Sequence, residues 1–479
     1  MNRKLLAAVI SAALAGCSLS PDYERPAAPV PGAWPSSATP GEKHLGTPKG
    51  WQQYFPDPRL QALITAALEN NRDLRIATAR ISEARAQYGV QRADRFPNVN
   101  ITASRNASLT PAGASSFTAN AIQTQRYDAG IGLLSYELDF WGRVGSLSEA
   151  AKANYLATEA AQRAFRLSLI SDVANAYLTV LELRERVMLT SETARARGET
   201  REMVSRRRQA GISSDMDFLQ AEGAYQASLA EHANLERQLA AAENLLDLLV
   251  GQYTSQIQNL PAERSLSEQG IVPAMIAGLP AEVLLRRPDV MAAEQRLIAA
   301  NANIGAARAA FLPRITLTGS AGSASRSLAG LFDKGSKAWS FQPALSMPLF
   351  DAGRTSANVD IAHARKVIAV AEYEKTLQQA FREVADLLSA GENLDVQLEA
   401  QSTNAQLQKK RLSLVEARYQ AGIASHLEVL DAQREAYAAE QSAAQARRAK
   451  LSVAVQLYKA LAWDNDALSG RTSPEDTAQ

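Results

Sequence analysis

The stretch "LDFWGRVGSLSEAAKANYLATEAAQRA", Leu138 to Ala164, changes its pattern of hydrophobic residues part-way along. Up to Phe140 the side chains alternate as in a half-buried β-strand, and after Gly142 the hydrophobic residues follow helical spacing. Glycine permits the backbone break between the two patterns, and Gly353 in "FDAGR" stands at the equivalent place further along the chain. We therefore predict a strand-helix hinge at both glycines.

The equivalence of these two glycines is part of an internal duplication. The halves share residues in the same order: Arg92, Pro97, Gly142 and Gly211 in the first, and Arg308, Pro313, Gly353 and Gly422 in the second. Each half is predicted to contain a helix, two strands, a long helix, a tight turn and a further helix. We place the first repeat at 51–265 and the second at 266–463.

Four strands of roughly ten residues are predicted, beginning near Asn98, Tyr127, Arg314 and Ala338. In the last of them large apolar residues alternate with small or polar ones, which is typical of a transmembrane barrel strand. A soluble sandwich strand with its apolar face inward is the alternative. Pro343 lies inside this alternation and has no backbone N–H, so we expect either a bulge there or a different strand boundary.

Four strands are too few to close a barrel, since about eight are needed and open edges in lipid leave backbone groups unpaired. If the strands cross a membrane, several chains must therefore each contribute four.

The two long helices are predicted at Arg143 to Gln209 and Arg354 to Gln420. At ~1.5 Å per residue each is roughly 100 Å long, which exceeds the thickness of any bilayer. The first carries two adjacent hydrophobic seams, one that includes Leu169 and Val173 and one that includes Ile170 and Met188. Two seams require a neighbour on each side, as in a bundle, a sheet of helices or a closed cylinder.

The N-terminus has the features of an export signal, with Arg3 and Lys4 before a short apolar run. We assign 1–16 to a signal peptide. Cys17, the single cysteine, follows "LAG", which resembles a bacterial lipobox, so we expect a covalent lipid on Cys17; a buried structural cysteine fits this position poorly. Residues 17–50 are predicted to form an extended tether, and 464–479 a disordered tail.

The tight turns between the helices contain the candidate functional residues. Gly211 and Gly422 suit a left-handed helix cap. Asp217 follows the first turn, and Glu428 and Asp431 follow the second, where the latter two share one helix face. In an oligomer each acid would repeat as a ring, although ordinary first-turn acids that stabilise a helix N-terminus give the same pattern.

Composition argues against an enzyme or a nucleic-acid-binding protein. The 479 residues have a net charge of +1, which indicates no polyanionic partner. The four histidines are scattered, there is no HExxH spacing, and no Walker-type glycine loop occurs. We therefore predict no catalytic residue, no metal site and no cofactor other than the lipid.

Several long segments resemble one family. "GLPAEVLLRRPDVMAAEQRLIAANANIGAARAAFLPRITLTGSAG", Gly278 to Gly322, is similar to the signature segment of the outer-membrane factors of tripartite efflux systems. "SYELDFWGRV" and "RYQAGIASHLEVLDAQ" resemble further blocks of these TolC-like proteins. The chain looks like the lipoprotein branch, close to the NodT-type ducts of resistance-nodulation-division pumps.

The resemblance implies a mixed α and β membrane protein. Three identical chains would form a twelve-stranded β-barrel in the outer membrane, continued by a long α-helical barrel in the periplasm. An equatorial region would hold the segments from Trp51 to Leu60 and from Pro261 to Leu279. The implied partners are outer-membrane lipid, a periplasmic adaptor protein and an inner-membrane resistance-nodulation-division transporter.

The resemblance also places a gate at the second turn, with Leu427 and Asp431 forming constriction rings and Glu428 between them. The first turn has Met216 and Gln220 at the positions equivalent to Leu427 and Asp431, and Asp217 at that of Glu428. The implied function is passive exit of small toxic compounds or drugs, which would contribute to antibiotic resistance. A structural coiled-coil envelope lipoprotein and a protein-secretion duct are the alternatives.

Overall fold

The computed structural model describes residues 19–32, 34, 50–113, 121–271 and 281–462. The predicted signal peptide, Cys17 and the C-terminal tail lie outside the described residues. The chain forms two compact units, and each draws on both halves of the sequence. The sheet unit comprises the described parts of 1–27, 80–159 and 292–374, and the hairpin unit those of 28–79, 160–291 and 375–479.

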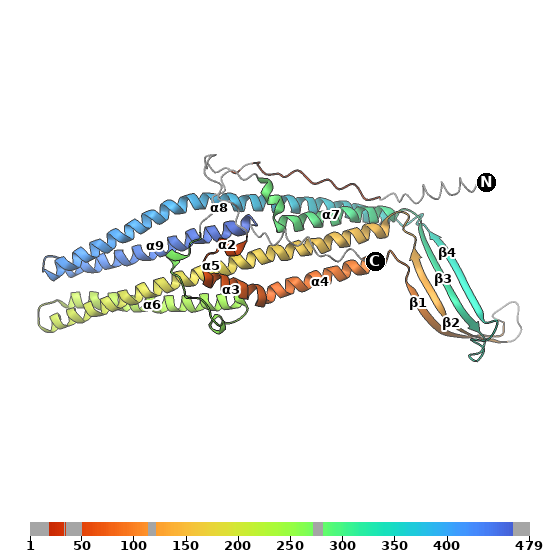
Figure 1. Ribbon diagram of the computed structural model, residues 1–479, viewed down its shortest axis with the longest axis horizontal. Helices are drawn as coiled ribbons and strands as arrows, with labels where there is room; N and C mark the ends of the chain where they lie inside the picture. Colours follow the sequence, from red (N-terminus) through yellow and green to blue (C-terminus); the bar gives the residue numbers. More distant parts are fainter. Residues whose placement is uncertain (1–18, 33, 35–49, 114–120, 272–280, 463–479) are drawn as a thin grey trace. The chain divides into compact units, whose positions relative to one another are not determined.

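The sheet unit contains one antiparallel sheet in the order β1-β2-β3-β4 (Figure 1). Its strands are β1 (Val99–Thr110), β2 (Ile122–Glu137), β3 (Arg314–Ser325) and β4 (Lys337–Ser346). The four predicted strands are confirmed, but β2 is longer than predicted, at 16 residues. Its ladder with β1 continues through the polar stretch Ile122 to Arg126, whose lack of hydrophobic alternation hid it.

The two faces of the sheet differ in chemistry. Cross-strand pairing puts Ile101 opposite Ile131, Ile131 opposite Ala321, and Ala321 opposite Trp339. Ile101 and Trp339 are 87% and 80% exposed, so an apolar row lies uncovered on this face. The neighbouring row consists of Thr102, Gly130, Gly322 and Ala338, which are small or polar. One apolar and one polar face is the arrangement of a membrane barrel wall.

Pro343 required neither a bulge nor a new boundary, so the prediction there was wrong. It pairs with Leu317 in an unbroken β3–β4 register. The Ala324 N–H donates to Ser336 C=O across these strands, which fixes the alternation of hydrogen-bonded pairs. Leu317 and Pro343 then form a non-hydrogen-bonded pair, and the missing N–H of Pro343 falls on the side away from β3. The observed irregularity is in β2, between Leu133 and Tyr136.

The helices of the sheet unit include α7 (Pro288–Ala309), which lies mostly in this unit, and the first turns of α5 (Arg143–Gln209) and α8 (Arg354–Gln420). Small side chains from α5 and α7 form a core here: Ala150, Ala153, Ala299 and Ala302. Side chains of this size let two helix backbones approach closely. The helix α4 (Arg72–Ala93) also contributes most of its length to this unit.

Residues 19–25, which we call the N-terminal strap, are bound to α7. Arg25 donates two hydrogen bonds to Glu294, at 2.7 and 3.0 Å, and the Tyr23 hydroxyl donates to the same carboxylate at 3.0 Å. Asn301 donates to the Pro21 carbonyl at 2.6 Å. A Cβ on Gly305 would lie 2.8 Å from the Ser20 Cα, so only glycine leaves room for the strap. The aperiodic sequence gave no sign of this docking.

Substitution of Glu294 by glutamine is expected to loosen the strap. The glutamine has no charge to pair with the half-exposed Arg25, and it accepts a weaker hydrogen bond from Tyr23. The free energy that holds the strap on α7 should fall by about 1–2 kcal/mol. Backbone amides of residues 19–25 should then exchange hydrogen roughly ten times faster, while α7 is unchanged. Glu24→Gln is the matched control, because Glu24 is exposed. Equal exchange in both variants would show that Glu294 does not hold the strap.

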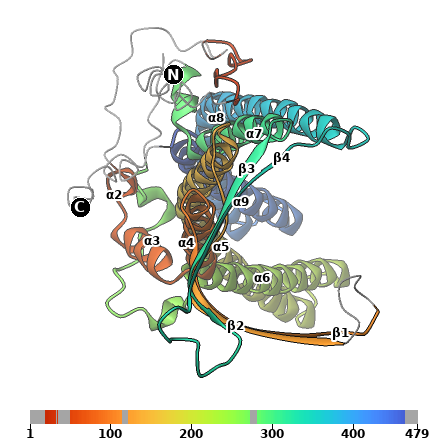
Figure 2. The ribbon, with the colours of Figure 1, turned by 90° about the vertical axis from the view of Figure 1, so that its right-hand side faces the viewer.

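The hairpin unit is built from four long helices. These are the greater part of α5 and α8, together with α6 (Asp215–Val250) and α9 (His426–Ala460). The predicted bounds of α5 and α8 are confirmed at both ends. Figures 1 and 2 show these four helices, and the order α6, α5, α9, α8 can be followed from bottom to top at the left of Figure 1.

Side-chain contacts fix this order. From α5, Arg201 pairs with Glu222 of α6 at 2.6 Å, and Thr190 hydrogen-bonds Tyr437 of α9 at 2.8 Å. Lys409 of α8 pairs with Glu440 of α9. Residues of both predicted seams of α5 are buried against neighbouring elements, among them Leu169, Ile170 and Val173. Met188, which was assigned to the second seam, is 56% exposed. Among the described residues no helix is long and apolar enough to cross a membrane.

The hairpin unit also contains an aromatic core. It involves α2 (Trp51–Tyr54) and α3 (Pro58–Asn70). Tyr54 and Phe55 pack on Tyr458 of α9, with ring centroids 5.0 and 5.4 Å away. The buried Asp57 begins α3 by accepting the Arg59 N–H, and it also accepts the Tyr177 hydroxyl at 3.0 Å. Arg59 donates to the Pro261 carbonyl, so the two segments that the resemblance assigned to an equatorial region do meet.

Candidate functional site

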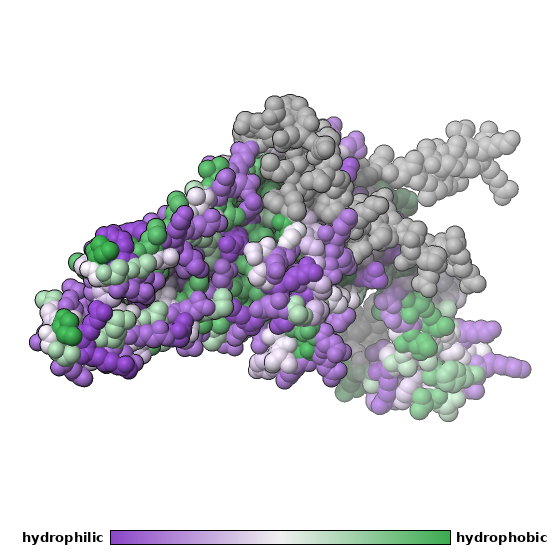
Figure 3. All heavy atoms as spheres, turned by 60° about the vertical axis from the view of Figure 1, so that its left-hand side comes forward, coloured by the Kyte–Doolittle hydropathy of each residue, from purple (hydrophilic) through white to green (hydrophobic). Residues whose placement is uncertain are grey.

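The two turns of the hairpin unit have the same backbone construction. Gly211 and Gly422 have φ values of 75° and 73°, in the left-handed region. The next residues, Ile212 and Ile423, each donate a backbone hydrogen bond at 2.8 Å to the carbonyl five residues earlier. This is the Schellman helix end predicted from the glycines. Ile212 and Ile423 are 77% and 69% exposed. Figure 3 shows scattered hydrophobic residues on the mostly hydrophilic surface of the hairpins.

The acids Asp217 and Glu428 act as helix caps. Asp217 accepts from the Ser214 N–H and hydroxyl, and Glu428 does the same with Ser425, so each forms a complete capping box. Hydrogen bonds from the Ser214 hydroxyl and N–H lower the pKa of Asp217. The Ser425 N–H and hydroxyl lower the pKa of Glu428 in the same way. Both carboxylates are thereby stabilised in their charged form.

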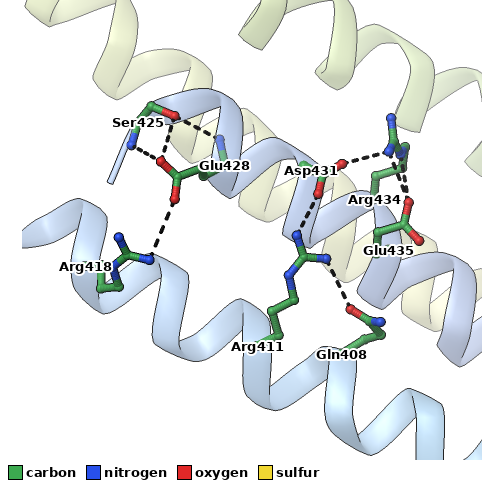
Figure 4. A network of polar contacts seen from close by, with 8 residues as sticks. All are labelled: Gln408, Arg411, Arg418, Ser425, Glu428, Asp431, Arg434 and Glu435. Carbon is green, nitrogen blue, oxygen red and sulfur yellow. Dashed lines mark hydrogen bonds and ion pairs between the residues drawn. The ribbon is translucent and has the colours of Figure 1, made fainter. Parts of the chain in front are cut away.

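Asp431 does not stand as an isolated negative charge. Arg411 donates to it at 2.8 Å from α8, and Arg434 donates at 2.7 Å from the next turn of α9 (Figure 4). Arg418 lies 3.8 Å from the second oxygen of Glu428. The sequence did not indicate these arginine partners, which pair the acids of the second turn with positive charges within one chain.

Leu427 and these charged groups border one groove of the hairpin unit, with a volume of about 750 Å³. Leu427 itself is 62% exposed, as suits a side chain that projects into open space. All four long helices contribute to the lining, which includes Thr190, Arg197, Glu231, Arg411, Glu428, Asp431 and Tyr437. The predicted gate residues Leu427, Glu428 and Asp431 are thus brought together, whereas Asp217 does not line this groove.

A direct contact joins the two turns. Arg207, near the end of α5, donates to the Tyr419 hydroxyl of α8 at 3.0 Å. Its guanidinium carbon also lies 5.4 Å from the centre of the Tyr419 ring, within cation–π range. Arg208 stays within its own hairpin, 3.6 Å from Asp215 and over Phe218. The contact joins residues that are 212 positions apart in the sequence, so the sequence alone gave no indication of it.

Both glycines at the predicted strand-helix hinges have a left-handed backbone conformation. Gly142 and Gly353 have φ values of 67° and 86° just before α5 and α8 begin. Asp139 accepts the N–H groups of Val144 and Gly145 and so caps α5. The Trp141 indole N–H donates to the Pro313 carbonyl at 2.8 Å, which makes this tryptophan an anchor of the strand-helix bend. Across the described residues, no group of three or more metal-binding side chains is gathered.

Comparisons with known proteins agree with this architecture. The model of the outer membrane efflux protein family matches residues 63–252 and 279–462, which also reflects the duplication. The solvent efflux pump outer membrane protein SrpC of Pseudomonas putida is 45% identical over 94% of this chain and 95% of its own.

Solved structures are similar as well. A membrane protein from Pseudomonas aeruginosa superposes with a TM-score of 0.84 at 41% identity, over 93% of this chain and all of the other. The open state of the Neisseria gonorrhoeae MtrE outer membrane channel gives a TM-score of 0.82 at 37% identity, over 93% and 98% of the two chains.

These similarities confirm the predicted fold class, the outer-membrane location and the role in efflux. They span the sheet unit and the hairpin unit alike, because they cover more than nine tenths of the chain. The chain is an outer-membrane component of an efflux pump, and it belongs to the outer membrane efflux protein family.

Proposed function

We propose that three copies of this chain form a passive exit channel for small toxic compounds such as solvents or drugs. The observation that carries the proposal is the four-stranded sheet with one exposed apolar face, one polar face and pairing partners on only one side of β1 and of β4 among the described strands. Open edges in lipid are costly, and twelve strands from three chains remove them. The polar face then lines a water-filled lumen.

The hairpin unit supplies the second part of the channel. Helices α6 and α8 are the outer members of the row α6, α5, α9, α8, so copies of the row can close into a ring of helices. The groove bordered by Leu427, Glu428 and Asp431 then faces the path of the solute. We place the narrowest point of this path at the two turns, where polar contacts join the helices.

The gate is held by ion pairs and by the contact between Arg207 and Tyr419. An opening movement that separates α8 and α9 from α5 breaks this contact, while the capping boxes stay intact because each lies within one hairpin. A periplasmic adaptor that binds the exposed tips supplies the energy for the movement. An inner-membrane resistance-nodulation-division transporter drives the solute, and the channel itself catalyses no reaction and needs no cofactor.

A lipid on Cys17 adds a second attachment to the outer membrane. The Leu19 carbonyl lies 3.5 Å from Arg308, at the last turn of α7 and six residues before β3. Cys17 precedes Leu19 by two residues in the sequence, so a lipid on Cys17 would be attached close to the docked strap.

The test is solute flux through proteoliposomes that contain the purified trimer. We expect small sugars to cross slowly without any ion gradient or nucleotide, and faster in the variant Arg207→Ala/Tyr419→Phe. His232→Gln, on the side of α6 and away from the contact, is the control. Flux that requires an ion gradient or a nucleotide would contradict passive transport. No flux in any folded variant would favour the structural lipoprotein.

The ion pairs of Asp431 lead to a specific prediction. Exchange of Arg411 for glutamine removes one of its two arginines, so the attachment of α9 to α8 weakens by up to about 1 kcal/mol and flux rises severalfold. Raising the salt concentration should reduce the difference from wild type, because partly exposed pairs are screened. If flux is unchanged at low salt, Asp431 is not part of the gate.

A further inference from the structure

His426 is a buried histidine at the second turn. It is the first residue of α9 and precedes Leu427, yet only 7% of it is exposed. Neither of its ring nitrogens has a hydrogen-bond partner among the described residues. A buried polar group without a partner is unfavourable, and it becomes far more so when it is charged.

Four side chains define the surroundings of this ring. Tyr419 of α8 lies with its ring centroid 5.8 Å away, tilted by 47°. Arg207 of α5 binds the Tyr419 hydroxyl, and both Arg207 and Asp217 of α6 are close enough to influence the charge of the histidine. On its own helix the nearest acid is Glu428, which Ser425 and Arg418 hold. His426 therefore lies where the two turns of the hairpin unit meet.

The electrostatic balance disfavours the charged ring. Burial lowers the pKa of His426, Asp217 raises it and Arg207 lowers it, and the result is a pKa below the ordinary value. The closed contact therefore binds the proton more weakly than an open, solvated turn does. Its stability is fully present above the pKa of the solvated ring and is lost as the pH falls below that value.

We propose that His426 is a positioning residue of the gate: its neutral ring packs the two turns together, and its protonation separates them and favours the open channel. The proposal rests on the gate proposed above. Acid thus opens the channel, through a group that titrates between about pH 5 and pH 8.

The neighbouring acids do not give the same response. Hydrogen bonds from Ser214 and Ser425 lower the pKa of Asp217 and of Glu428, so both stay ionised in this range. Their capping boxes weaken only when the pH falls through these lowered pKa values. An acid response above about pH 5 therefore reports on His426 rather than on the caps.

The experiment measures two properties of the trimer in lipid between about pH 7.5 and pH 5. One is channel open probability, and the other is hydrogen exchange of the turn amides, corrected for the intrinsic effect of pH on exchange. In wild type both should rise as the pH falls. The opening equilibrium should change by up to about tenfold per His426 side chain for each unit of difference between its pKa values in the closed and open states. In His426→Gln both should be independent of pH, and in the control His232→Gln they should follow wild type.

Two further variants test the mechanism if His426→Gln folds poorly. Asp217→Asn removes the group that raises the pKa of the closed state, so the pKa difference between closed and open states grows and the acid response should become larger. Arg207→Gln removes a cation that lowers this pKa, so the difference shrinks and the acid response should become smaller. An acid response in His426→Gln equal to that of wild type, or an acid response that neither Asp217→Asn nor Arg207→Gln changes, would overturn the proposal.

The two readouts separate this inference from the channel proposal. Turn exchange that depends on His426 without any conductance would support the switch and contradict the channel. Conductance without acid-dependent turn exchange would support the channel and contradict the switch.

Discussion

Replacing Arg287 by methionine is expected to destabilise the hairpin unit by about 2–3 kcal/mol, less than the roughly 3–5 kcal/mol of a fully buried ion pair because the Asp289 and Glu383 side chains are 40% and 34% exposed. Arg287 is only 6% exposed. It donates to the Ala460 carbonyl at 2.8 Å, to Asp289 at 2.8 Å and to Glu383 at 2.9 Å. It therefore joins the start of α7, the middle of α8 and the end of α9, and methionine would leave two acids without their cation.

The pH dependence of this effect follows from Asp289. Burial raises the pKa of Asp289, but the hydrogen bonds and charge of Arg287 outweigh burial and hold this pKa below its ordinary value. The contribution is present above the unfolded pKa and is lost as the pH falls through the folded one. The difference in unfolding midpoint between wild type and variant should thus shrink in acid.

Arg286→Met is the matched control, since this neighbouring arginine is exposed. Thermal unfolding of the detergent-solubilised protein is the measurement. Equal midpoints for Arg286→Met and Arg287→Met would mean that the ion pairs do not hold the helix ends together.

Replacing Gly322 by alanine is expected to prevent correct formation of the sheet. Gly322 pairs directly with Gly130 across β2 and β3. A Cβ on Gly322 would lie 2.2 Å from the Ala129 carbonyl oxygen and 2.5 Å from the Gly130 Cα. Both are backbone atoms, which cannot rotate away, so the strands must separate at a cost of about 1–3 kcal/mol or more.

Gly132→Ala provides the control within the same sheet. A Cβ on Gly132 would have only an ordinary contact, 3.8 Å from the Gly319 carbonyl oxygen. We expect the heat-dependent gel mobility of a folded barrel to be lost in Gly322→Ala and kept in Gly132→Ala. Normal mobility of Gly322→Ala would show that β2 and β3 tolerate a wider separation.

The sequence predicted those features that rest on local periodicity. The bounds of α5 and α8 could be predicted because helical spacing persists between a glycine hinge and a glycine cap. The alternating strands could be predicted for the same reason, except where β2 begins in polar residues. The error at Pro343 arose because hydrogen-bond phase depends on the partner strand, which no single strand reveals.

Long-range contacts were beyond the reach of the sequence. The strap on α7 depends on the space above Gly305, and the contact of Arg207 with Tyr419 joins distant segments. His426 looked like one of four scattered histidines, and only its burial between two turns distinguishes it. The two arginine partners of Asp431 were likewise not predictable, because Arg411 lies 20 residues away on another helix and the side-chain direction of Arg434 depends on the local packing.

The most direct test of the gated channel is planar-bilayer conductance of the purified protein at neutral pH. Wild type is compared with Leu427→Ala and with Glu428→Ala/Asp431→Ala. We expect small conductance steps in wild type that grow severalfold in both variants, because each variant widens the groove at the second turn. Large wild-type steps that neither variant changes would contradict a gate at this turn.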